Sequence, residues 1–84
     1  MTQMTHELTD EEMVEQLTRA LDRRADLLGW PRTRQDAIDQ IGDDMLYFLL
    51  HGDLCARSGR YPKSRRIADR MAAECARGLL QLTR

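Results

Sequence analysis

His51 and Cys55 are the side chains best suited to chemistry by type and spacing, because they lie four residues apart. On a helix this spacing places two metal ligands on one face. A structural zinc site needs two further ligands, and the sequence supplies none convincingly, since His6 lies in the N-terminal segment. We therefore expect neither a metal nor a cofactor, and we interpret His51 as a surface histidine near a helix end.

Two acidic pairs, Asp43-Asp44 and Glu11-Glu12, could in principle do general acid–base work. Adjacent residues on one helix point about 100° apart, however, so the two carboxylates of a pair do not converge. The sequence predicts no histidine paired with serine or cysteine and oriented by a third group, and it has no glycine-rich phosphate loop. We therefore expect that the protein is not an enzyme.

Basic side chains gather in the last third of the chain. Residues 1–54 carry a net charge of −7, from 12 acidic and 5 basic side chains, whereas residues 55–84 carry +6, from 2 acidic and 8 basic ones. The basic residues that could track phosphates or face an acidic partner are Lys63, Arg65, Arg66, Arg70 and Arg77. The charge division is also explained by two halves of opposite charge that fold against each other.

Three helices are needed to position these residues, and capping signals predict them at about 10–28, 34–58 and 62–83, after a flexible tail at 1–8. Thr9 with Glu12 forms a capping box at the first start, and Thr33 caps the second. Gly29-Trp30-Pro31 ends the first helix, and Pro62 suits the first turn of the third. No strand alternation and no repeat is present, so one all-α domain over 1–84 is predicted.

The apolar stripes predict an antiparallel up-down-up three-helix bundle whose middle helix is shared by two hairpins. Between the second and third helices, equal spacing pairs Ile38 with Leu82, Ile41 with Leu79, Met45 with Cys75, and Leu49 with Met71. Between the first and second helices it pairs Leu21 with Ile41, Leu17 with Met45, and Val14 with Phe48. In this register Cys55 lies about 15 Å along the bundle from Cys75, so no disulfide joins them, and Cys55 is a partly exposed thiol.

The second helix carries more apolar side chains than one core face needs. The stripe Tyr47, Leu50 and Leu54 either completes the core or forms a contact surface for a partner, including a second copy in a homodimer. Tyr47 and Trp30 are of the types favoured at interface hot spots. We therefore expect a small regulatory protein-interaction module, an adaptor or inhibitor of a larger protein. The alternatives are a nucleic-acid-binding regulator that uses the basic stripe, and a small subunit of a larger assembly.

Composition sets the remaining expectations. No run approaches the length of a membrane span, and the N-terminus has no signal-peptide pattern, so we expect a cytoplasmic location and no membrane partner. Of the 13 basic residues all but Lys63 are arginine, which indicates a GC-rich, bacterial or phage genome.

Overall fold

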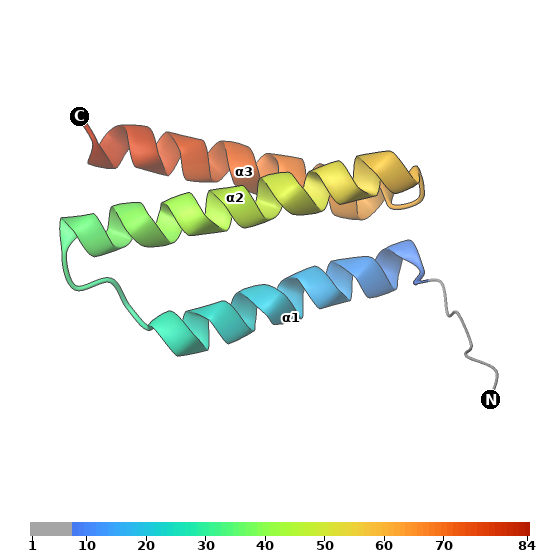
Figure 1. The fold of residues 1–84 in the computed structure, drawn as a ribbon, viewed down its shortest axis with the longest axis horizontal. Helices are drawn as coiled ribbons and strands as arrows, with labels where there is room; N and C mark the ends of the chain where they lie inside the picture. Colours follow the sequence, from blue (N-terminus) through green and yellow to red (C-terminus); the bar gives the residue numbers. More distant parts are fainter. Residues whose placement is uncertain (1–7) are drawn as a thin grey trace.

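The computed structural model describes residues 8–84, which form three helices and no strand. Helix α1 spans Asp10–Leu28, α2 spans Arg34–Ser58 and α3 spans Pro62–Leu82. They run alternately up, down and up in an elongated bundle (Figure 1). The predicted all-α three-helix bundle is confirmed. The predicted N-terminal tail lies, apart from residue 8, outside the described residues.

Local capping explains where α1 and α2 begin. The Thr9 hydroxyl accepts a hydrogen bond from the Glu12 N–H at 3.1 Å, and the Glu12 carboxylate accepts one from the Thr9 N–H at 2.9 Å. This reciprocal pair is the predicted capping box. At α2 the Thr33 hydroxyl accepts from the Asp36 N–H at 3.0 Å, while the Asp36 carboxylate accepts from the N–H of Arg32 rather than that of Thr33.

Helix α3 has no side-chain cap of its own at its start, and side chains of the other two helices contact both of its ends. At its start the Asp10 carboxylate of α1 accepts hydrogen bonds from the backbone N–H groups of Lys63 at 2.8 Å and Ser64 at 3.1 Å. At its end the Arg34 guanidinium of α2 donates to the carbonyl oxygens of Leu82 and Arg84. Each charge has the sign that complements the helix dipole at that end, so both contacts stabilise α3 in the bundle.

Helices α2 and α3 form the closest pair. Gly59, at φ 68° in the left-handed region, ends α2, and Pro62 opens α3. Gly52 faces α3, where an added Cβ atom would lie 2.8 Å from Asp69 Oδ1, so a side chain here would require the Asp69 carboxylate to move. Neither this glycine nor Gly42 interrupts α2, which is continuous.

The core lies towards the end of the bundle where α2 turns into α3. Leu17 of α1, Phe48 of α2, and Ala68 and Ala72 of α3 are buried together. The partly buried apolar side chains packed around this cluster are Leu21, Met45, Tyr47, Ile67, Met71 and Cys75. Leu17, Met45 and Cys75 therefore belong to one core, although the register predicted between the first two helices differs from the observed one.

The predicted arrangement of α1 is wrong in two respects. Helix α1 packs chiefly on α3, so α3 rather than α2 is the shared helix. The predicted register places residue 38 opposite Arg24, but the Arg24 guanidinium pairs with Asp44, with 3.0 Å between Nη2 and Oδ1. This is a shift of six residues, about 9 Å along a helix. Asp10 fixes the start of α1 beside the start of α3, and α1, at 19 residues, is shorter than α2, at 25.

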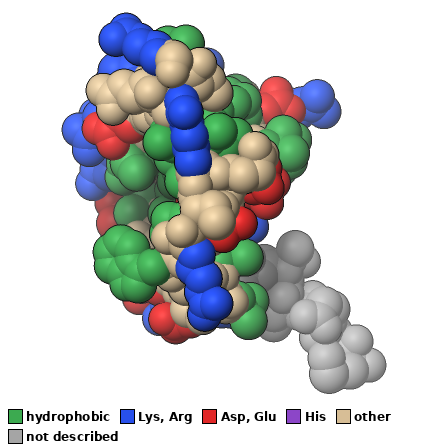
Figure 2. Space-filling model, turned by 90° about the vertical axis from the view of Figure 1, so that its left-hand side faces the viewer, with side chains coloured by type: hydrophobic (Ala, Val, Ile, Leu, Met, Phe, Trp, Pro, Cys, Tyr) green, Lys and Arg blue, Asp and Glu red, His purple; other side chains and the backbone are tan. Residues whose placement is uncertain are grey.

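The opposite end of the bundle is consequently open. The first turns of α2 extend past the end of α1, and residues 29–33 run along them (Figure 1). Leu28, the last residue of α1, is 49% exposed, and a hollow of about 470 Å³ lies between Leu21, Leu28 and Trp30 on one side and Gln40 on the other. Figure 2 looks onto this end and shows hydrophobic side chains at the surface.

The Arg24–Asp44 pair is the polar contact between α1 and α2 that holds this register, and Arg24 Cζ also lies 6.0 Å from the ring centroid of Tyr47. We predict that Arg24→Ala lowers the free energy of unfolding by about 1 kcal/mol, because a half-buried pair and a cation–π contact are lost. Arg23→Ala, at the exposed neighbouring position, is the matched control and should stay within about 0.5 kcal/mol of the parent. Urea unfolding measures both, and equal losses would contradict this register.

Candidate protein-interaction surface

Four exposed leucines form a continuous apolar surface on α2, which we name the leucine face. They are Leu46, Leu49, Leu50 and Leu54, with 56%, 51%, 62% and 56% of each residue exposed. Their spacings of three and four residues place each beside the next on the helix surface. Leu49, predicted to pack against Met71 in the core, is an exposed member of this face, which corrects that prediction.

The leucine face exists because α2 is apolar on two opposite sides. Its inner side buries Phe48, Gly52 and Cys55. Leu46 and Leu50 each lie two residues from Phe48, and two residues correspond to about 200° around a helix. They therefore point away from the core, and neither α1 nor α3 covers them. A helix on the surface of a globular protein normally has one apolar stripe, so the second stripe sets α2 apart.

The other candidate contact residues are not all on this face. Tyr47 is half-buried and packs inside the bundle, with its ring centroid 6.1 Å from that of Phe48 and 6.2 Å from that of His51. Trp30 is 92% exposed, but it borders the hollow at the open end. The structure thus places Leu50 and Leu54 together and places Tyr47 and Trp30 elsewhere. Exposed Leu46, which completes the stripe, could have been found from its four-residue spacing to Leu50.

The basic stripe of α3 is partly neutralised within the chain. The Lys63 ammonium lies 3.0 Å from the Glu11 carboxylate, and Arg65 lies 3.7 Å from Asp69. The hydrogen bond between Lys63 and Glu11 lowers the pKa of the Glu11 carboxyl and raises the pKa of the Lys63 ammonium. The stripe residues that are exposed and have no carboxylate partner within residues 8–84 are Arg66, Arg70 and Arg77.

A histidine–serine pair, which the sequence did not predict, joins α2 to α3. His51 Nε2 lies 2.6 Å from Ser64 Oγ, and the Ser64 N–H donates to Asp10, so side chains from three helices meet here. Ser64 is 0% exposed, so its hydroxyl cannot reach a substrate, and the pair acts as a buried hydrogen bond. His51 is accordingly half-buried rather than a surface residue. The two residues are 13 positions apart on different helices, so no local sequence signal reveals the pair.

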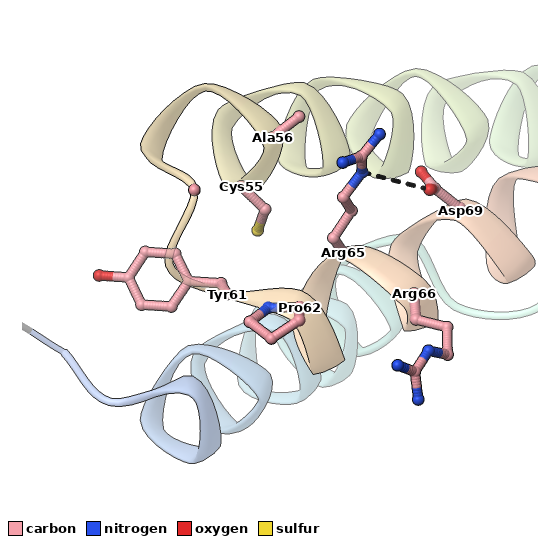
Figure 3. Close-up of a pocket in the computed structure, with 8 residues that line it drawn as sticks. Cys55, Ala56, Tyr61, Pro62, Arg65, Arg66 and Asp69 are labelled. Atoms are coloured by element: carbon pink, nitrogen blue, oxygen red, sulfur yellow. Dashed lines mark ion pairs between the residues drawn. The ribbon is translucent and has the colours of Figure 1, made fainter.

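The Cys55 thiol points from α2 into the space between α2 and α3, where Tyr61 and Pro62 also lie (Figure 3). Cys55 is 2% exposed, which corrects the expectation of a partly exposed thiol. Burial raises the pKa of Cys55 despite a hydrogen bond to Ser64, and this favours the unreactive thiol over the thiolate. Both cysteines are free. Over the described part of the chain, no three His, Cys, Asp or Glu side chains gather as metal ligands would.

Comparison of the chain with protein-family models, with curated proteins and with solved structures gave no match. None of the helices in residues 8–84 combines the length and apolar character needed to cross a membrane.

Burial lowers the pKa of His51 below its ordinary value of 6.5, so the unfolded chain binds a proton more readily than the folded one. Stability from this group is therefore complete above about pH 6.5 and is lost as the pH falls through the folded-state pKa. We predict that the parent loses more unfolding free energy between pH 7.5 and pH 5.5 than His51→Gln does.

Denaturant unfolding of both proteins at the two pH values tests this, and His6 is present in both, so it cancels from the comparison. An equal loss in the two proteins would show that His51 is not the titrating group.

Proposed function

We propose that this protein is a small, non-catalytic interaction module that acts as an adaptor or inhibitor by binding a protein partner through the leucine face. The observation that carries the proposal is the 62% exposure of Leu50 at the centre of four neighbouring exposed leucines. Together they expose on the order of 400 Å² of apolar surface, which is comparable with the functional patches of small soluble proteins.

The geometry of the polar groups also favours binding over catalysis. The one histidine–serine pair that the described residues bring together is closed to substrate by the burial of Ser64. The buried thiol of Cys55 has a raised pKa, which is the opposite of what a nucleophilic cysteine needs. Apolar surface on α2 and unpaired arginines on α3 are exposed, and both are suited to protein contacts.

Nucleic-acid binding through α3 is the second proposal, and the ion pairs make it the weaker one. Lys63 and Arg65 each already face a carboxylate, which reduces the charge available to phosphates. Arg66, Arg70 and Arg77 remain exposed and unpaired in the described structure. Three arginines on one helix give electrostatic attraction but little means of reading a sequence.

Leu50→Asp tests the proposed function, with Leu80→Asp as its matched control. Leu80, on α3, is 63% exposed, so the two substitutions place the same charge at equally exposed leucines on different helices. We predict that both variants keep the unfolding free energy of the dilute protein within about 0.5 kcal/mol, because neither leucine is core.

We further expect that proteins retained from a host extract by the parent and by Leu80→Asp are lost from Leu50→Asp. Identical retention by all three proteins would overturn the proposed function. Severe unfolding of Leu50→Asp alone would instead show that this leucine supports the fold.

A further inference from the structure

We propose that the leucine face binds a second copy of this chain, with the two α2 helices antiparallel about a two-fold axis that passes beside Leu50. This inference rests on the proposal that the leucine face binds a protein, and it identifies that protein as a second copy in place of a larger partner. The outer side of α2 has a self-complementary order of side chains, with an acid before the leucines and a base after them. An interface between identical surfaces requires such self-complementarity.

The pairing follows from residue numbers alone. When Leu50 lies opposite Leu50 of the second copy, Leu46 lies opposite Leu54 of that copy. By symmetry, Leu54 lies opposite Leu46 of that copy. Asp43 then lies opposite Arg57 of the second copy, one helical turn beyond the leucines at each end. Leu46, Leu50 and Leu54 of each copy are thereby paired, Leu49 lies beside them opposite position 51, and an ion pair closes both ends.

The charges of these end residues are available for such a contact. Asp43 is exposed and has no ion-pair partner within the described chain. Arg57 pairs with Asp53 of its own helix at 2.9 Å, but its side chain is 79% exposed and that of Asp53 is 57% exposed, so this pair is weak. Arg57 can therefore face two carboxylates in the dimer, one from each copy.

Other registers are disfavoured by the same charges. An antiparallel pairing centred on position 48 would place Asp43 against Asp53 of the second copy. A parallel pairing would place Asp43 against Asp43 and Arg57 against Arg57. Like charges directly opposed in an interface repel each other. The register centred on Leu50 pairs leucine with leucine and acid with base, so it is favoured over the other registers.

The apolar area of the leucine face is also of the order that a dimer interface needs. The leucines contribute on the order of 400 Å² per copy, about half of the roughly 800 Å² per partner that a stable interface buries. The flanking side chains of α2 supply further surface. Dimer formation adds buried apolar surface to a short chain whose own core contains many half-buried apolar side chains, and this stabilises the fold.

The test is the mass in solution by sedimentation equilibrium over a concentration series, with 9.8 kDa as the monomer. We expect a reversible dimer for the parent and for Leu80→Asp, and at least tenfold weaker association for Leu50→Asp. Asp43→Arg and Arg57→Asp should each weaken the dimer as well. The double variant Asp43→Arg/Arg57→Asp should restore it, because the two charges exchange places across the interface.

A parent that stays monomeric up to about 1 mM, a dimer that Leu50→Asp leaves intact, or a double variant weaker than both single variants overturns the proposal. Failure here is distinguishable from failure of the proposed function. A monomeric parent that still retains another protein, which Leu50→Asp loses, removes the second copy as partner and leaves the interaction surface standing.

Discussion

The contact on which the rest of this structure depends is the carboxylate of Asp10 at the start of α3. Helix α3 has no cap of its own there, and two of its free backbone N–H groups donate to this side chain from another helix. Buried backbone donors without partners are costly, so the contact ties the position of α1 to the position of α3. At the other end of α3, the Arg34 guanidinium of α2 donates hydrogen bonds to the carbonyl oxygens of Leu82 and Arg84.

The shape of the bundle follows from this anchoring. Because α1 begins level with α3 and is shorter than α2, it covers the core end and leaves the opposite end open. Neither α1 nor α3 reaches the outer side of α2, where Leu46 and Leu50 remain exposed. The surface that we propose for binding is therefore a consequence of how three helices of unequal length share one core.

The sequence predicts the local parts of this fold well, since caps and breaks are local. Thr9 and Pro62 mark helix starts that the structure has. The sequence-based prediction fails where the result depends on contacts between helices. The spacing of the apolar stripes assumes that α1 pairs with α2 through a tight connection. The Asp10 cap places α1 beside the start of α3 instead. Leu49 illustrates the same limit, because apolar character alone does not distinguish a core position from a partner surface.

Amide hydrogen exchange at Lys63 and Ser64 tests the anchoring directly, in the parent and in Asp10→Ala. The account predicts that these two amides are protected in the parent and exchange at least tenfold faster in the variant, while amides in the middle of α3 change less. Glu11→Ala, which removes the neighbouring exposed carboxylate, should leave both amides protected. Unchanged protection at Lys63 and Ser64 in Asp10→Ala would contradict the account.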